Sequence, residues 1–148
     1  PEQIKLFAQI FSTLAFPKFS KTNKKILQQT LFKKILIFTI ILSIITFIYI
    51  LLSPLIFKFI FPQYTESLRY SQIFSITIIG TSLLLTFTAL KAQKQTNEIY
   101  IFNILTGIIQ IILILLLLPT FKLWGIIIAR IFSRFFDLIL INYLFFKK

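Results

Sequence analysis

Three charged side chains interrupt a very apolar stretch near the C-terminus. Arg130, Arg134 and Asp137 are spaced at i, i+4 and i+7, which places them within about 60° of one another on one side of a helix. Guanidinium groups bind phosphate or pyrophosphate through paired hydrogen bonds. Because two guanidinium groups outnumber one carboxylate, this edge can hold an anionic ligand. The same residues can instead form a local ion pair that only locks helices together, with Arg130 extending to the membrane interface.

Two amides are further candidates for lining a polar cavity. Asn103 and Gln110 share a helical face with Thr106 and Gly107, and lipid tails cannot satisfy their hydrogen-bonding groups. We therefore expect this face to point toward another helix or a water-filled cavity. Two other apolar stretches carry hydroxyl groups on one face, and for these simple packing between helices suffices. They are Thr39, Ser43, Thr46 and Ser53 in one stretch, and Ser75, Ser82 and Thr86 in the other.

Other kinds of chemistry find few suitable residues. The sequence has no Cys and no His, which removes thiolate and imidazole ligands for a metal and the commonest general base. Its acids are Glu2, Glu66, Glu98 and Asp137, and they are widely separated, whereas acid–base catalysis usually needs groups that act together. We expect no catalytic residues, no metal and no cofactor, and therefore not an enzyme. A membrane glycosyltransferase or ligase is a less favoured alternative.

The composition places these residues in a membrane. Of 148 residues, 57% are hydrophobic and only 14% are charged, whereas soluble domains are about half apolar and a quarter charged. Three runs contain no charge, namely 35–57, 70–90 and 99–121, and each exceeds the roughly 20 helical residues that cross a bilayer. A fourth run, 124–146, contains the Arg130–Asp137 edge. On an insertion scale its charges cost roughly 8 to 10 kcal/mol, so this edge must turn away from lipid.

The expected fold is an all-α integral membrane bundle with four complete transmembrane helices, one truncated N-terminal helix and short loops. One transmembrane domain covers residues 1–148, and we expect it to be a fragment of a larger transporter. Pro62 and Pro119 are expected to mark outer turns, and Pro54 to bend the end of its span. Residues 20–34 are typical of a short amphipathic helix on anionic headgroups. The expected helices cover approximately residues 2–16, 35–57, 68–90, 98–118 and 124–146.

The basic residues predict an orientation. The 16 Lys and Arg residues exceed the 4 acidic ones by 12 charges, and alternating connections between spans place most of them on one side. The positive-inside rule then puts that side, and the C-terminus, in the cytoplasm of a multi-pass protein. Because topology accounts for the excess, we expect no nucleic acid partner. The crowded side holds Lys18, Lys21, Lys24, Lys25, Lys33, Lys34, Lys91, Lys94, Lys147 and Lys148, against Lys58, Arg69 and Lys122 opposite.

Four short motifs along the chain resemble those of a known family. They are Phe16-Pro17-Lys18-Phe19-Ser20, Leu52-Ser53-Pro54 through Phe61-Pro62-Gln63-Tyr64, Leu90-Lys91-Ala92-Gln93-Lys94, and Leu118-Pro119 through Trp124-Gly125-Ile126-Ile127-Ile128-Ala129. Their order resembles the C-terminal half of bacterial polysaccharide flippases of the Wzx type, within the multidrug/oligosaccharidyl-lipid/polysaccharide (MOP) exporter superfamily. The resemblance covers nearly the whole chain. One departure is Pro62, where the family often has Gly, so the outer turn there is expected to differ in shape.

The resemblance implies a function and its partners. Such a protein has two pseudo-symmetric helical bundles around a cavity. It moves undecaprenyl-pyrophosphate-linked oligosaccharide, used for O-antigen and lipopolysaccharide, across the bacterial inner membrane. The partners would be the lipid bilayer, that substrate and the missing N-terminal bundle, with Arg130 or Arg134 holding the anion. The alternatives are a multidrug or ion-coupled exporter of related fold and a purely structural membrane subunit.

Overall fold

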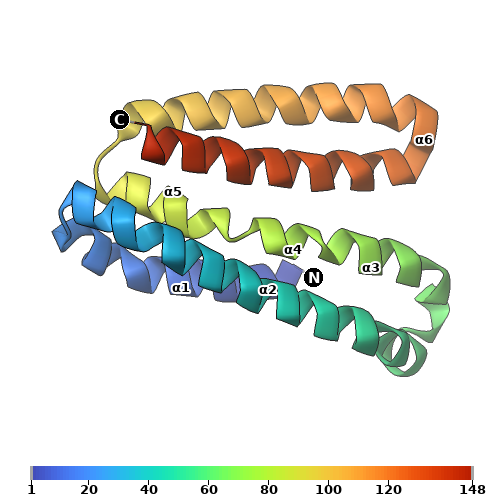
Figure 1. Ribbon diagram of the computed structural model, residues 1–148. Coiled ribbons are helices and arrows are strands. Elements are labelled where there is room, and N and C mark those ends of the chain that lie inside the picture. The colour runs from blue at the N-terminus through green and yellow to red at the C-terminus, as the bar shows by residue number, and fades with distance from the viewer. Residues whose placement is uncertain (1, 148) are drawn as a thin grey trace.

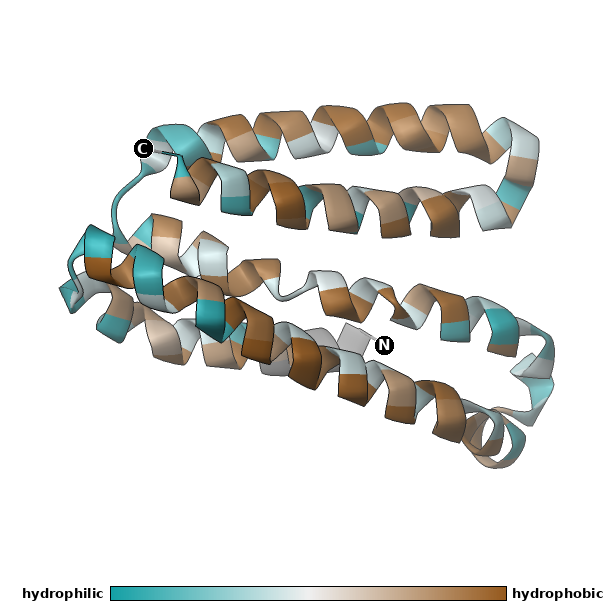
Figure 2. Cartoon of the chain, viewed as in Figure 1, coloured by the Kyte–Doolittle hydropathy of each residue, from teal (hydrophilic) through white to brown (hydrophobic). Residues whose placement is uncertain are grey.

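The computed structural model describes residues 2–147, with the side chains of residue 6 and of residues 8–147, and it is helical almost throughout (Figure 1). Three stretches, Lys24–Ile60, Pro62–Ala92 and Thr96–Phe146, are long and apolar enough to cross a membrane. Their middle parts are hydrophobic and their ends hydrophilic (Figure 2). The elements are α1 (Glu2–Lys21), α2 (Lys24–Ile60), the 3-10 helix η1 (Pro62–Ser67), α3 (Leu68–Ser75), α4 (Thr77–Gly80), α5 (Leu83–Ala92) and α6 (Thr96–Phe146).

The first two helices are longer than the sequence suggested. α1 continues through Pro17 to Lys21 instead of ending near residue 16, and α2 begins three residues later. The side-chain oxygen of Asn23 caps α2 by accepting a hydrogen bond of 3.1 Å from the Lys25 N–H. The expected amphipathic helix over 20–34 is therefore no separate element, because most of it forms the first turns of α2. At ~1.5 Å per residue these 37 residues extend over roughly 55 Å, well beyond a hydrocarbon core of about 30 Å.

Pro54 lies inside α2, and the helix continues past it to Ile60. Proline has no N–H, so the carbonyl of Ile50, four residues earlier, loses its usual helical donor. Two side chains replace that donor. The Ser53 hydroxyl donates to the Ile50 oxygen at 2.8 Å, and the Gln72 amide donates to it at 3.2 Å from α3. The proline thus creates an acceptor that ties α2 to the next span.

The α6 segment folds back on itself. Lys122 adopts φ 51° and ψ −126°, and the chain reverses there into an outgoing arm, residues 96–121, and a return arm, residues 123–146 (Figure 1). The reversal lies three residues beyond Pro119, which still belongs to the last turn of the outgoing arm. Gly125 allows the arms to approach, since a Cβ atom there would lie 2.2 Å from the carbonyl oxygen of Leu117.

The span expected as one helix over 68–90 is interrupted twice. α3 and α4 meet at Ile76, and α4 and α5 meet at Thr81 and Ser82. At the second interruption the N–H groups of Thr81 and Ser82 donate to the carbonyls three residues earlier, at 2.9 and 3.2 Å. These are 3-10 bonds, and such a stretch inside a helix often marks a functional hinge. Of the three stretches that could cross a membrane, the interrupted one is also the most enclosed, with most of its central apolar residues buried inside the protein.

The helices are joined at one end by an apolar cluster and by amide groups. The cluster includes Phe19 of α1, Leu31 of α2, Leu90 of α5 and Phe145 of α6, all almost completely buried. The last carbonyls of a helix lack helical partners. Here Gln93 donates to the carbonyls of Phe19 and Thr22 at 2.8 and 3.0 Å, and Gln28 donates to that of Phe145 at 2.8 Å.

This end is also the basic end. The α1–α2 turn, the α5–α6 connection and the end of α6 lie together, whereas η1 and the Lys122 turn lie at the opposite end (Figure 1). The lysines that were expected on the crowded side belong to the first group of segments, with Lys148 outside the described residues. The fold thus separates the chain into a lysine-rich end, called the basic end below, and an end with few charges.

The close approach of the α6 arms yields a prediction. Gly125→Ala should destabilise the protein by about 1–3 kcal/mol, because the new methyl group collides with backbone of the outgoing arm, which cannot rotate away. Gly107→Ala is the matched control, since a Cβ there meets nothing within 4 Å. Thermal unfolding in detergent, followed by the fluorescence of the single tryptophan, measures both. Equal stability of the two variants would contradict the hairpin geometry.

Candidate functional site

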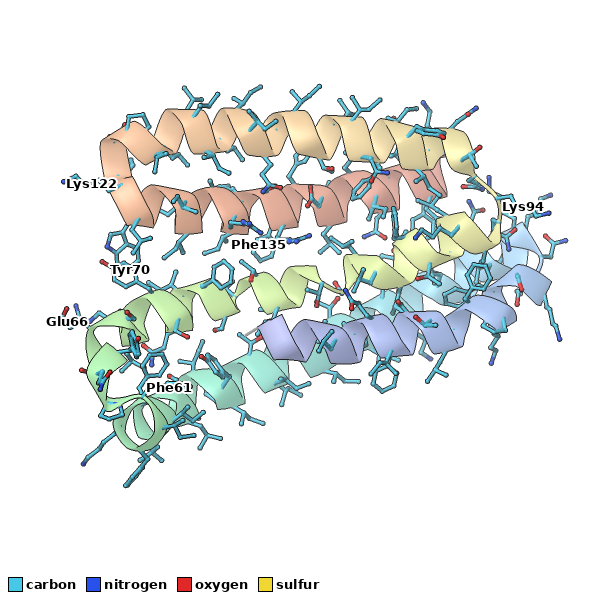
Figure 3. The ribbon with its side chains drawn as sticks, turned by 180° about the vertical axis from the view of Figure 1, so that it is seen from behind. Phe61, Glu66, Tyr70, Lys94, Lys122 and Phe135 are labelled. Atoms are coloured by element: carbon cyan, nitrogen blue, oxygen red, sulfur yellow. The ribbon has the colours of Figure 1, made fainter. Side chains whose placement is uncertain are left out.

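The return arm of α6 runs parallel to the interrupted span, and three contacts fix their register. The rings of Tyr70 and Trp124 lie 4.7 Å apart, close to the Lys122 turn (Figure 3). Gly80 faces Arg134, and the Thr86 hydroxyl donates to the Asn142 side-chain oxygen at 2.8 Å. In each contact the partner lies 54 to 56 residues further along the chain. Because this offset is nearly constant, it tells which residues of the interrupted span lie at the same height as each residue of the return arm.

Arg134 packs directly against the second interruption. A Cβ atom on Gly80 would lie 2.9 Å from the Arg134 Cβ and 3.4 Å from its carbonyl oxygen. A larger residue at position 80 would push the return arm away, so Gly80 lets the arginine backbone approach the middle of the span. The guanidinium of Arg134 lies 3.8 Å from the Asp137 carboxylate, with 32% of the arginine side chain exposed and 8% of the aspartate.

Two buried side-chain oxygens lie at the level of the Arg134–Asp137 ion pair. Among the described residues, the second carboxylate oxygen of Asp137 and the hydroxyl of Ser82 have no hydrogen-bond partner. The offset of 54 to 56 residues places Asp137 level with Ser82 and Leu83. Three neighbouring hydroxyls, those of Ser75, Thr77 and Thr81, instead donate to carbonyls of their own helix. The Asp137–Ser82 level is therefore a polar spot in an otherwise satisfied interface, suited to a bound water or ion.

Arg130 lies on the same arm, one helical turn before Arg134. It is half-buried, and the same offset places it level with Ile76, the first interruption of the span. The predicted polar edge of Arg130, Arg134 and Asp137 therefore lies alongside both interruptions of the neighbouring span. The runs 35–57, 70–90 and 99–121 contain no charged residue, so Arg130, Arg134 and Asp137 dominate the electrostatics of the membrane interior. We call them the Arg134 site.

The two predicted amides lie elsewhere. Asn103 and Gln110 belong to the outgoing arm, where Asn103 is exposed and Gln110 is half-buried. The carbonyl of Asn103 accepts a long hydrogen bond of 3.4 Å from Thr106 in its own helix. The three register contacts with the interrupted span come from the return arm, whereas the outgoing arm meets that span near the basic end, where the rings of Phe87 and Phe102 lie 5.8 Å apart. The structure thus separates these amides from the Arg134 site, although all five candidates belong to α6.

The hydroxyl series predicted for α2 also differs from interhelical packing. Thr39, Ser43 and Thr46 donate to carbonyls four residues earlier in the same helix, at 2.8 to 2.9 Å. The polar bonds between helices pair a hydroxyl with a larger side chain. They are Gln72 to Ser53 at 2.9 Å, Tyr49 to Ser71 at 2.6 Å, and Thr86 to Asn142. Ser53 and Thr86 belong to the predicted hydroxyl series, whereas sequence reasoning did not single out their partners Gln72 and Asn142.

A second polar feature lies between α1 and α5. A cavity of about 430 Å³ is lined by four residues of α1 and four of α5, both sets at helical spacings of 0, 3, 4 and 7. The same spacing is visible in the sequence, where the first helix is expected only as a truncated span. Lys91 lies at the basic end of this cavity, with its ammonium 4.6 Å from the Phe87 ring centre. The lining residues are Gln9, Ser12, Thr13, Phe16, Leu84, Phe87, Thr88 and Lys91.

The charged side chains of the return arm have the chemistry to bind an anion. This arm carries two guanidinium groups and one carboxylate in Arg130, Arg134 and Asp137, and guanidinium recognises phosphate through paired hydrogen bonds. Within residues 2–147, no group of three carboxylate, imidazole or thiolate side chains is placed to hold a metal ion. What the site offers is a partly exposed positive edge beside a helix with two weak points in its hydrogen-bond ladder.

The parallel register yields a test. Thr86→Val and Asn142→Leu should each lower stability, and the double variant should lose less than the two single losses together. The coupling energy should be about 0.6 kcal/mol and at most about 1.7, as for other hydrogen bonds between membrane helices. Thr106→Val is the control and should leave stability unchanged, because its hydroxyl only contacts its own helix. Zero coupling in detergent unfolding experiments would refute this contact.

Comparison with known proteins adds no further assignment: no family model, no curated protein and no solved structure matches the chain.

Proposed function

We propose that this chain is part of a membrane exporter that moves an anionic, lipid-linked oligosaccharide across the membrane, and that it acts in transport rather than in catalysis. The observation that supports the proposal best is the apposition of Arg134 and Gly80. It holds the backbone of Arg134 beside the second interruption of the most buried span. Charged groups in the membrane interior usually mark ligand or ion pathways, because their burial is costly unless they serve a site.

The interrupted span supports motion of this site. Transporters commonly build their sites from broken helices near the middle of the membrane, and breaks in the ladder of hydrogen bonds allow a helix to bend locally. Here both breaks lie beside an arginine. Bending at Ile76 or at Thr81 and Ser82 would change how far the guanidinium groups extend from the return arm. An anion held by them would then be exposed to one side or the other.

The cavity between α1 and α5 supports a polar route to the basic end. It is lined by hydroxyl and amide groups and is bordered by Lys91. A cavity of about 430 Å³ falls within the size range of small-molecule sites, roughly 300 to 1,000 Å³. It would accept water and the polar part of a cargo.

The resemblance to Wzx-type flippases of the MOP superfamily makes the proposal specific. The cargo would be an undecaprenyl-pyrophosphate-linked oligosaccharide used for O-antigen and lipopolysaccharide, and the membrane would be the bacterial inner membrane. Under this proposal, α1, α2, α3–α5 and the two arms of α6 are one truncated and four complete transmembrane helices of a C-terminal bundle. The basic end, with the C-terminus, faces the cytoplasm, as the positive-inside rule requires.

Replacement of Arg134 tests the proposal. Arg134→Gln should reduce polysaccharide export at least about tenfold, since it removes a charge-assisted, two-bond contact to the anion. Arg134→Lys should retain part of the activity, because it keeps the charge but not the paired geometry. Export is measured in a bacterial strain that lacks its own exporter and is complemented with the gene for the whole exporter that contains this chain.

Asn103→Leu is the control for that experiment, because Asn103 is exposed on the other arm of α6; its export should match that of the wild-type chain. Membrane content and detergent unfolding of every variant are measured in parallel. Normal export by Arg134→Gln with unchanged stability would contradict the proposal and favour a pair that only locks the bundle.

An ion-coupled exporter of related fold is a second candidate, favoured by the partnerless oxygens of Asp137 and Ser82. A carboxylate beside a hydroxyl in the membrane interior can bind a coupling proton or cation. In that case Asp137→Asn should lose the dependence of export on an imposed ion or proton gradient, while Ser75→Ala, whose hydroxyl donates to its own helix, should keep it. Unaltered gradient dependence in Asp137→Asn would exclude this second candidate.

A further inference from the structure

A groove separates α1 from α2 near the basic end of the bundle. α1 packs mainly on α5, not on α2, and the space between the first two helices is a cavity of about 270 Å³. Its wall is formed by Phe11 and Ala15 of α1 and by Ile37 and Phe38 of α2. The rings of Phe11 and Phe38 lie 6.1 Å apart. This feature, the α1–α2 groove, is distinct from the Arg134 site and from the cavity between α1 and α5.

Two lysines lie where the groove approaches the α1–α2 turn. Lys18 belongs to the last turns of α1, and Lys34 comes directly before the charge-free run of α2. The ammonium of Lys34 lies 5.5 Å from the centre of the Phe19 ring. None of the described residues that line the groove is acidic. The groove is thus hydrocarbon along its length and positively charged at the end that lies at the level of the membrane surface.

The bilayer determines what kind of molecule meets this surface. Phe11, Ile37 and Ile41 are exposed, and in a chain that crosses a membrane such residues face acyl chains. Lysine side chains at this depth extend their ammonium groups toward the headgroups. Cationic side chains attract the anionic lipids of the cytoplasmic leaflet, an effect worth roughly a fivefold change in affinity for each lysine.

We propose that the α1–α2 groove binds one anionic phospholipid of the surrounding membrane, with an acyl chain against Phe11, Ile37 and Phe38 and the phosphate between Lys18 and Lys34. The inference requires only that the chain lies in a membrane and does not depend on the export function. The bound lipid would join two helices that pack poorly on each other. It would therefore hold α1, and with it one wall of the cavity between α1 and α5, in place.

The test is a titration of the detergent-solubilised chain with phosphatidylglycerol or phosphatidylcholine, with bound lipid counted by native mass spectrometry. Phosphatidylglycerol should bind at least about tenfold more tightly than phosphatidylcholine, since only its headgroup is anionic. The double variant Lys18→Gln/Lys34→Gln should weaken phosphatidylglycerol binding by about 30-fold, at roughly fivefold per lysine. Ala15→Phe, which fills the groove, should weaken it although both lysines are present.

The control is Lys24→Gln/Lys25→Gln, which removes the same charge from the basic end of the bundle but from outside the groove. Its affinity for phosphatidylglycerol should stay within about twofold of the wild-type value, because neither side chain faces the bound phosphate. Equal weakening in the two double variants would show diffuse attraction and overturn the proposal. Wild-type affinity in Ala15→Phe would do the same, as would displacement of phosphatidylglycerol by an equal concentration of undecaprenyl phosphate.

Discussion

The absence of water from the hydrocarbon core is the constraint on which this structure depends. Every polar group in the spans must find a partner inside the protein, and the chain meets this requirement in two ways. Small hydroxyls such as those of Thr39 and Ser43 donate to their own helix. Larger amides such as those of Gln72 and Gln93 reach carbonyls on neighbouring helices. The helices are held together largely at these carbonyls, because apolar side chains are equally well solvated by lipid.

Under the same constraint, a proline and the ends of helices provide carbonyl groups that bind neighbouring helices. The carbonyl that Pro54 leaves without its helical donor becomes the acceptor that binds Gln72 of α3. The last carbonyls of α1 and α6 accept from Gln93 and Gln28. These carbonyls thus become joints between helices. The Asp137–Ser82 level differs, since two buried oxygens there have no partner; the side-chain oxygen of Gln95, in the α5–α6 connection, also has none.

That exception coincides with the charged edge and with a break in the most buried span. A bundle that served only for packing would gain stability from apolar residues at Arg134 and Asp137, since burying an ion pair is seldom favourable. Gly80 brings the backbone of Arg134 close to the interrupted span, and the retained charges there support the proposed binding role. The α1–α2 groove and the cavity beside Lys91 lie nearer the basic end. Charge therefore recurs at two depths, at the surface and midway through the protein.

The sequence by itself determined the apolar, helical character of the chain, its separation into a basic and a weakly charged end, and the shared edge of Arg130, Arg134 and Asp137. These properties follow from composition and from helical periodicity, which are local. The tertiary structure decided three other features. They are the joining of residues 24–34 to α2, the breaks at Ile76 and at Thr81 and Ser82, and the pairing of Thr86 with Asn142.

The physical reason is that each of these features depends on a neighbour distant in sequence. A Ser or Thr in a span looks the same whether its hydroxyl serves its own helix or another one, and the distinction depends on which helix lies beside it. Asn103 and Asn142 are both amides on α6, yet only Asn142 faces the interrupted span. Their difference comes from the reversal at Lys122, after which Asn142 of the return arm lies beside Thr86 of the interrupted span.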